Sequence, residues 1–301
     1  MDSFVKNGLH FRVLDASKKT VAVRMISDHI SFRETVAKRS RGSFVLRIPK
    51  TVRHGWKFYT VTEIDDEYAF KDNSYHTYTE DKRFKDGYRR EFRHSFESYI
   101  GFSKTPIISV EFPKTIEKIG RSAFLMCEEL EKVDLSSTSL VEIGDSAFGG
   151  CHKLTKVELP DTVKVIGESA FSGCDKLEKV DLSSTKLVEI GETTFSACGS
   201  LTKVELPDTV KVIGGKAFYN CEKLQEIHIP TSLEKIGERA FWACKSLKEI
   251  KIPSNVYRIE FDAFKYISKL KVTIYNSKDK VDISYYVFDE DAIIEYKDKG
   301  L

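Results

Sequence analysis

Six cysteines are the side chains with the greatest potential for chemistry, because thiols can bind zinc, form disulfides or act as nucleophiles. Their spacing argues against these roles. Successive cysteines are 24, 23, 24, 23 and 23 residues apart, and no CxxC pair is present. A constant period is typical of one position repeated along a stack, where a buried thiol packs as a small hydrophobe. We therefore expect reduced, structural cysteines at Cys127, Cys151, Cys174, Cys198, Cys221 and Cys244.

Other catalytic or metal-binding patterns are missing from the sequence. The seven histidines are scattered, and none has another histidine or a cysteine two to four residues away. The HExxH, GxSxG and P-loop motifs do not occur. The sequence therefore predicts a protein that is not an enzyme and that uses neither a cofactor nor a metal ion.

The period of the cysteines is shared by pairs of other residues, which identifies a tandem repeat. Ile-Gly recurs six times at this spacing, and Ala-Phe recurs with Thr194-Phe195 in one of its places. Two versions of the unit alternate. One contains Val-Glu-Leu-Pro-Asp-Thr, and the other contains Val-Asp-Leu-Ser-Ser-Thr and is one residue longer. A single unit cannot bury its apolar groups, but stacked neighbours can, so the repeat predicts a solenoid.

Each unit combines a strand with a turn and a more compact segment. In residues 154–160, apolar and charged side chains alternate as in a half-buried strand, and Pro160 ends that strand. Gly167 permits a backbone turn that a side chain would hinder. Ala170, Cys174 and Leu177 are spaced by four and three residues, so one or two helical turns can face all three inward.

This pattern, Ile/Leu-Pro-x-x-Val-x-x-Ile-Gly-x-x-Ala-Phe-x-x-Cys-x-x-Leu, resembles the BspA-type leucine-rich repeats of bacterial surface proteins. The match covers roughly residues 43–275. The resemblance implies an α/β fold: a right-handed, curved leucine-rich-repeat solenoid with a parallel concave sheet and short helical turns or short strands on the convex side. It also implies roles in adhesion and protein binding, and a secreted or surface-attached protein.

Three parts and one insertion are expected. Residues 1–48 lack the repeat and predict a β cap, with strands on both sides of residues 16–19. Residues 49–275 form the solenoid, with a small hairpin around Gly55 in the first repeat. Residues 276–301 form a C-terminal cap containing strands at 284–288 and 292–296. Residues 71–106 are an insertion of about thirty residues, judged against the repeat length.

The near-neutral net charge of +2 conceals an asymmetry. Residues 1–106 carry 21 basic and 14 acidic side chains, a net charge of +7, and residues 107–301 carry 27 and 32, a net charge of −5. Eleven of the 14 arginines precede residue 107. The N-terminal third also holds many acids and lacks any nucleic-acid-binding motif, so we expect no nucleic-acid partner.

The insertion is the first candidate binding site. Aromatic residues at helical spacing share one face of an expected helix, and arginines lie around it. The helix either docks its aromatic face on the solenoid or forms a protrusion that binds a partner, for which Tyr and Arg are typical anchors. The candidate residues are Tyr88, Arg89, Arg90, Phe92, Arg93, Phe96 and Tyr99.

The exposed positions of the repeated strand are the second candidate. They predict two columns of charged side chains, and the sign of the charge in each column inverts in the last two repeats. These columns form either a solvated face or an electrostatic register for a charged partner. Neither column contains an aromatic residue, which disfavours sugar stacking there. The first column is Lys132, Lys156, Lys179, Lys203, Glu226 and Glu249. The second is Asp134, Glu158, Asp181, Glu205, His228 and Lys251.

These features predict a noncatalytic module that binds a protein or extracellular-matrix partner. A structural spacer without a ligand and a glycan-binding surface protein are the alternatives. We expect a monomer, secreted or at the cell surface, although the sequence leaves a cytoplasmic location open. No apolar run approaches the roughly 20 residues that a transmembrane helix needs.

Overall fold

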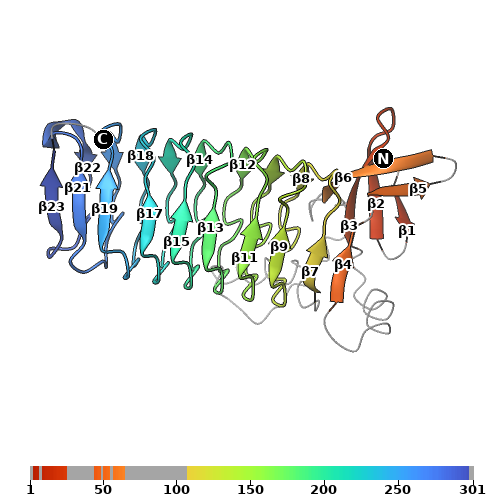
Figure 1. Cartoon of the computed structure of the whole chain (residues 1–301), viewed down its shortest axis with the longest axis horizontal. Helices are drawn as coiled ribbons and strands as arrows, with labels where there is room; N and C mark the ends of the chain where they lie inside the picture. The colour runs from red at the N-terminus through yellow and green to blue at the C-terminus, as the bar shows by residue number, and fades with distance from the viewer. Residues whose placement is uncertain are drawn as a thin grey trace, which may run out of the picture.

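A computed structural model describes residues 3–6, 9–25, 44–48, 50–54, 57–64 and 107–297. These residues form an elongated solenoid in which successive repeats are successive coils (Figure 1). The N-terminal strands lie at one end and the last coil lies at the other. The expected parallel-strand solenoid is confirmed, and the described residues contain almost no helix.

The longer strands of the coils form one side of the solenoid. Seven of them make a parallel sheet, and three more make a second parallel sheet beside it. The seven are β4 (Phe44–Arg47), β7 (Ile107–Glu111), β9 (Lys132–Asp134), β11 (Lys156–Glu158), β13 (Lys179–Asp181), β15 (Lys203–Glu205) and β17 (Glu226–His228). The three are β19 (Glu249–Ile252), β21 (Lys271–Ile274) and β23 (Ile293–Tyr296). Together we call them the long-strand face, which turns alternate side chains inward.

Two-residue strands form a second side of each coil. They pair in parallel as two groups, β8 (Lys118–Ile119), β10 (Glu142–Ile143) and β12 (Val165–Ile166), then β14 (Glu189–Ile190), β16 (Val212–Ile213), β18 (Lys235–Ile236), β20 (Arg258–Ile259) and β22 (Asp282–Ile283). Of the two structures expected opposite the main sheet, the short strands are the ones observed.

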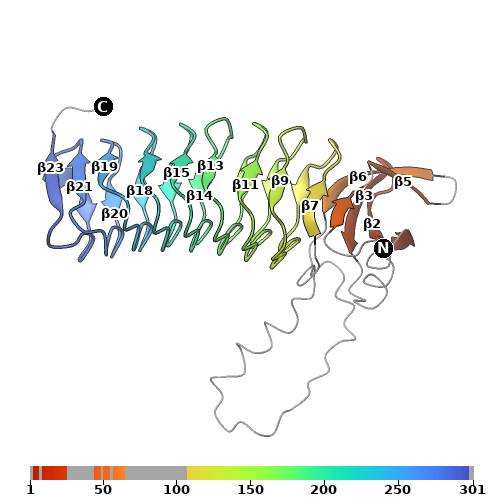
Figure 2. The same ribbon diagram turned by 60° about the horizontal axis from the view of Figure 1, so that its bottom comes forward.

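The N-terminal strands extend the first short-strand group. As expected, β2 (Leu9–Asp15) and β3 (Thr20–Met25) are an antiparallel hairpin, and β1 (Ser3–Lys6) pairs with β2. The expected second hairpin consists of β5 (Thr51–His54) and β6 (Lys57–Ile64). Strand β6 then pairs in parallel with both β3 and β8, which joins the hairpins to the solenoid. The hairpin strands lie at the N-terminal end of the solenoid (Figure 2).

The expected helical turns are wrong, although the inward positions are right. Ala170, Cys174 and Leu177 are all buried, but the segment between them is a series of turns. Ser169 and Gly173 have φ values of 56° and 71°, in the left-handed region, which a continuous right-handed helix cannot contain. Among the described residues the only helix is the 3-10 turn η2 (Lys278–Lys280). The segment from the Ile-Gly pair to the cysteine of each coil is called the turn face below.

Backbone hydrogen bonds along the turn face run between coils. The amide of Phe171, for example, donates to the carbonyl oxygen of Thr194 in the next coil at 2.9 Å. The coils approach closely here, and this explains the glycine of the Ile-Gly pair. A Cβ added to Gly144 would lie 2.6 Å from the backbone nitrogen of Arg121. The glycine is therefore needed because the coils approach closely, and not because its backbone is left-handed.

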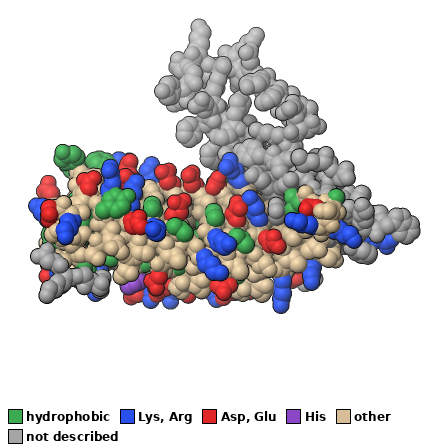
Figure 3. All heavy atoms as spheres, turned by 90° about the horizontal axis from the view of Figure 1, so that it is seen from above, with side chains coloured by type: hydrophobic (Ala, Val, Ile, Leu, Met, Phe, Trp, Pro, Cys, Tyr) green, Lys and Arg blue, Asp and Glu red, His purple; other side chains and the backbone are tan. Residues whose placement is uncertain are grey.

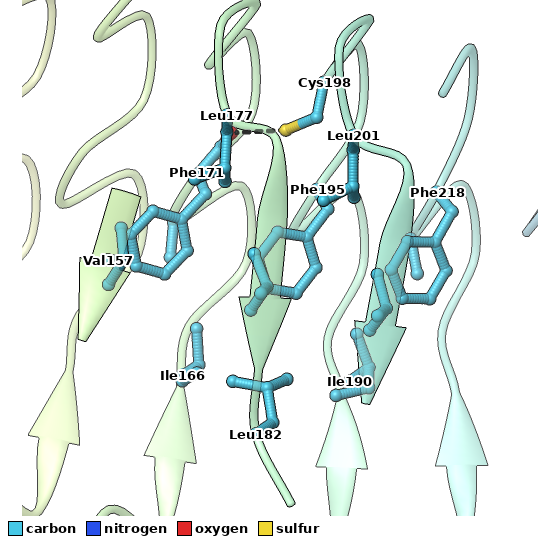
Figure 4. Close-up of a cluster of buried hydrophobic side chains, with 14 of the residues drawn as sticks. Val157, Ile166, Phe171, Leu177, Leu182, Ile190, Phe195, Cys198, Leu201 and Phe218 are labelled. Atoms are coloured by element: carbon cyan, nitrogen blue, oxygen red, sulfur yellow. Dashed lines mark hydrogen bonds between the residues drawn. The ribbon is translucent and has the colours of Figure 1, made fainter. Parts of the chain in front are cut away.

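Stacked phenylalanine rings fill the centre of the solenoid (Figure 4). Neighbouring rings are nearly parallel, with centroids 5.0–5.6 Å apart, through the column Phe124, Phe148, Phe171, Phe195, Phe218, Phe241, Phe264 and Phe288. Isoleucines of the short strands and leucines that flank the long strands surround them. Each ring therefore packs against two coils at once, which makes neighbouring coils depend on each other.

The last segment continues the solenoid. Strand β22 pairs with β20, β23 pairs with β21, and the Phe288 ring stacks on Phe264. Of the two strands expected here, 292–296 corresponds to β23, whereas at 284–288 the structure has only a bridge at Phe288. Residues 276–297 thus form one more coil, and the boundary at residue 275 stays a prediction.

Candidate functional site

The insertion site lies outside the described residues. This applies to Tyr88, Arg89, Arg90, Phe92, Arg93, Phe96 and Tyr99. Their role in binding a partner therefore stays a prediction from the sequence.

The two charged columns lie on the long-strand face. Strand pairing places Lys132, Lys156, Lys179, Lys203 and Glu226 in one register. The second column runs beside it, with pairs such as Glu205 and His228. Strands β17 and β19 belong to different sheets, so Glu249 and Lys251 continue the columns beyond a break in strand pairing. Their role in binding a partner is a proposal.

The charged side chains form different contacts in the two repeat versions. In the proline-containing coils, lysine and glutamate of one strand form ion pairs, Lys156 with Glu158 and Lys203 with Glu205, the latter at 2.8 Å. These contacts raise the pKa of Lys156 and of Lys203, chiefly through the hydrogen bond to the neighbouring glutamate. Lys203 also lies 3.4 Å from Glu226 in the next coil. These lysines are therefore partly neutralised within the face.

In the serine-containing coils the acid turns toward a different partner. The Asp181 carboxylate accepts hydrogen bonds from the backbone N–H of Ser183 at 3.0 Å and from its hydroxyl at 2.6 Å. Asp134 accepts the same two bonds from Ser136. Bonding to Ser183 lowers the pKa of Asp181, because it stabilises the charged form. Because the aspartate bonds to this local turn, the lysine of the same strand does not form an ion pair with it.

Lys132 and Lys179 are consequently distinct from the other lysines of the column. Both are exposed, and neither has an ion-pair partner among the described residues. They lie two coils apart, a separation of roughly 10 Å at the usual strand spacing. The alternation of repeat versions therefore produces free cations at every second coil.

The cysteines are buried and free, as the sequence predicts. In five coils the thiol donates to the carbonyl oxygen of the phenylalanine in the preceding coil, for example Cys198 Sγ to Phe171 O at 3.2 Å (Figure 4). Burial raises the pKa of Cys174 and of Cys198 well above the ordinary thiol value. Such thiols are protonated and inert at neutral pH. Within the described ranges, no three His, Cys, Asp or Glu residues are grouped to hold a metal ion.

An aromatic groove on the turn face is a site that sequence reasoning missed. It is an open hollow of about 700 Å³ on the last coils. Its rings are contributed by Tyr219, Trp242, Phe261, Tyr266 and Tyr286. Three cations, Lys216, Arg239 and Lys265, and the acid Asp262 also line it, with Ser196. Larger hydrophobic patches are visible near the C-terminal end of the solenoid in Figure 3.

A change in one repeat column could have revealed this groove. The residue after the central phenylalanine is glycine or serine in three consecutive coils, at Gly149, Ser172 and Ser196. It then becomes Tyr219 and Trp242, whose rings stack with centroids 4.5 Å apart. A switch from small residues to large aromatics at this half-buried repeat position indicates a local surface function, because the core does not require it.

The fold places the chain among parallel-strand, leucine-rich-repeat solenoid proteins. The family model for the BspA-type leucine-rich repeat region matches residues 95–196 and 188–296. The chain therefore belongs to the BspA-type leucine-rich-repeat family. A comparison with curated proteins finds no match.

Two solved structures support the same fold. A leucine-rich repeat protein from Bacteroides ovatus is 20% identical, with a TM-score of 0.58, and the match covers 97% of this chain and 71% of that one. The T. pallidum leucine-rich repeat protein is 21% identical, with a TM-score of 0.55, covering 82% and 91%. A leucine-rich cell surface protein from Faecalibacterium prausnitzii, at 19% identity, covers 98% and 95% with a TM-score of only 0.34. No helix in the described part of the chain is long and apolar enough to cross a membrane.

Proposed function

We propose that this chain is a noncatalytic protein-binding module whose long-strand face contacts an acidic surface of a protein or matrix partner. The observation that carries the proposal is the pair of free cations, Lys132 and Lys179, held in register by the sheet. The repeat family supports a scaffold role for the chain. A secreted or cell-surface location is part of the proposal, because the family resemblance implies it.

The spacing of the free lysines gives the proposal its specificity. A rigid row of cations roughly 10 Å apart attracts a partner whose acidic side chains have a similar spacing. The intervening Lys156 is already paired with Glu158. Exposed pairs of this kind contribute little energy and offer a partner less net charge. The inversion of polarity at Glu226 would limit the contact to the coils before it.

Capture of partners from host-cell-surface and matrix extracts tests this proposal. The double variant Lys132→Gln and Lys179→Gln should lose captured partner, whereas Lys156→Gln with Lys203→Gln should keep most of it, because those lysines are paired with glutamate. Both variants remove two positive charges, so they are matched in net charge. Equal capture by the two double variants and the parent would rule out the long-strand face.

A second arm addresses the insertion. A chain lacking residues 74–104 should keep the circular dichroism spectrum of the parent if the solenoid folds without the insertion. If this deletion abolishes capture and the lysine variants do not, the insertion is the binding site. If no extract yields saturable binding to the parent chain, the structural-spacer alternative is favoured.

A further inference from the structure

The aromatic groove is built from two rows of rings with charged side chains between them. In the first row Tyr219 stacks on Trp242, and Trp242 meets Tyr266 edge-to-face at 4.8 Å. In the second row Phe261 meets Tyr286 at an angle of 90°. A perpendicular pair uses the face of one ring and the edge of the other. Tyr266 and Tyr286, which are 58% and 69% exposed, therefore keep ring surface available for a ligand.

The cations of the groove are positioned beside these rings. The Arg239 guanidinium lies 5.5 Å from the centre of Phe261, and Lys265 Nζ lies 6.0 Å from the centre of Tyr286. Arg239 also contacts Glu238 at 2.8 Å and Asp262 at 3.2 Å, and Lys265 contacts Asp289 at 3.4 Å. Both cations are therefore already paired with acids. The positive charge that the groove offers to a ligand comes from Lys216, the third cation of its lining.

Lys216 adds a cation that is available for a ligand. It is exposed, and the described residues include no acidic partner within ion-pair distance of it. It lies at the rim of the groove in the coil that contributes Tyr219. An anionic group bound here would gain a charge-assisted hydrogen bond without first breaking an existing ion pair.

The backbone of the groove is not free to bind an extended peptide. The amide of Lys216 donates to Glu238, that of Asn220 donates to Trp242, and that of Arg239 donates to Phe261, at 2.7–3.0 Å. A peptide that adds as a strand needs a row of unpaired backbone N–H and C=O groups. In these turns the backbone groups already form hydrogen bonds between neighbouring coils. Recognition must therefore depend on ring surfaces and charged side-chain tips, a combination suited to sugar rings that bear carboxylates.

We propose that the aromatic groove binds an acidic oligosaccharide, with its sugar rings against Tyr266 and Tyr286 and a carboxylate at Lys216. The hollow of about 700 Å³ lies within the range of small-ligand sites. The site is separate from the long-strand face and takes a different class of ligand. Binding here does not require that a protein partner be captured by the lysine columns.

Fluorescence titration with trigalacturonic acid tests this proposal, with galactotriose as the uncharged control. The chain has two tryptophans, so a Trp56→Phe background makes Trp242 the only tryptophan, and its emission can be excited selectively. Calorimetry on the unaltered chain provides a second measurement. We expect a saturable change in emission with the acidic trisaccharide. Binding of galactotriose should be about tenfold weaker or more, because it lacks the charge-assisted contacts.

The test substitutions introduce a residue that other coils already have at the same position. Lys216 and Tyr286 have φ values of 56° and 58°, and serine occupies the same turn position in three coils, with φ values of 53–56°. Lys216→Ser and Tyr286→Ser should therefore fold, and each should weaken the acidic trisaccharide about fivefold to tenfold. Lys176→Ser, at an exposed lysine in an earlier coil, should leave binding unchanged.

Several outcomes would overturn the proposal. One is the absence of saturable binding by both trisaccharides, and another is equal affinity for the charged and uncharged sugars. A third is unchanged affinity in both groove variants. Hexaglutamate provides the remaining control: if this peptide binds as tightly as the acidic trisaccharide and competes with it, the groove attracts anions in general and sugar recognition is wrong.

Discussion

Alkaline pH should unfold this protein by way of its buried thiols. Burial raises the pKa of five of them in the folded chain: Cys151, Cys174, Cys198, Cys221 and Cys244. In the unfolded chain the thiols return to an ordinary pKa of about 8.5. The unfolded state therefore loses its thiol protons first. The stability linked to these groups is complete below the unfolded pKa and is lost as the pH rises toward the folded pKa.

The size of the effect follows from the number of thiols. One group that is protonated only in the folded state lowers the free energy of unfolding by about 1.4 kcal/mol for each pH unit within this window. Five such groups together remove roughly 6 kcal/mol between pH 9 and 10. This is comparable to the total stability of a typical domain, about 5–15 kcal/mol. Unfolding should therefore become measurable within about one pH unit above 9.

Urea denaturation followed by circular dichroism, under reducing conditions from pH 7.5 to 10, measures this slope. Cys174→Ala should be less stable than the parent at every pH, but its stability should fall less steeply above pH 9, by about 1.4 kcal/mol per unit. Leu177→Ala, a truncation of a buried side chain in the same coil, keeps all six thiols and should keep the parental slope. Parallel curves for the parent and Cys174→Ala above pH 9 would refute the reasoning.

Three further predictions concern packing and backbone, each measured as the free energy of unfolding in urea at neutral pH. Phe171→Ala and Phe218→Ala should each cost about 3–5 kcal/mol, because both rings are buried between stacked neighbours; a cost below about 1 kcal/mol at both would contradict the stacked core. Gly237→Ala should destabilise by roughly 1–3 kcal/mol, since its Cβ would lie 2.6 Å from backbone of the preceding coil, whereas Gly199→Ala meets nothing within 4 Å and should be neutral or slightly stabilising. Ala197→Gly should stabilise by about 0.5–1 kcal/mol, because Ala197 has a φ of 57° where two other coils have glycine; a loss of stability would contradict this account.

The repeat period was sufficient to predict the columns of the solenoid. Because every coil adds the same residues at the same spacing, the inward positions of the phenylalanines and cysteines and the register of Lys156 with Lys179 follow from the period. The conformation between those columns could not be predicted in the same way. Inward residues spaced by four and three fit a helix, but they fit a turn ladder with two left-handed residues per coil equally well. Non-glycine residues such as Ser169 gave no sign of that conformation.

The candidate sites were predictable to different degrees. The charged columns were found because they lie on strands, whose alternation is regular. Lys179 has no ion-pair partner in its own strand because the Asp181 carboxylate bonds to Ser183 in an Asp-x-Ser turn. The sequence contains this motif, but only the side-chain contacts show that the carboxylate turns away from the lysine. The aromatic groove combines residues from four turn positions in several coils. Its shape depends on how far neighbouring coils twist and how their side chains tilt, which the period does not specify.

Two changes of surface occur within one repeat length along the solenoid. The turn-face column changes from Ser196 in the coil of Phe195 to Tyr219 in the coil of Phe218, and the first charged column changes one strand later, from Lys203 to Glu226. The phenylalanine stack runs through this step unchanged, with rings 5.6 Å apart. Packing therefore does not require either change, and a scaffold of equivalent coils would not produce both at one place by its own physics. We infer that the coils before and after this step serve different contacts. The cation row belongs to the first group and the aromatic groove belongs to the second, so substitutions in one should leave binding at the other intact.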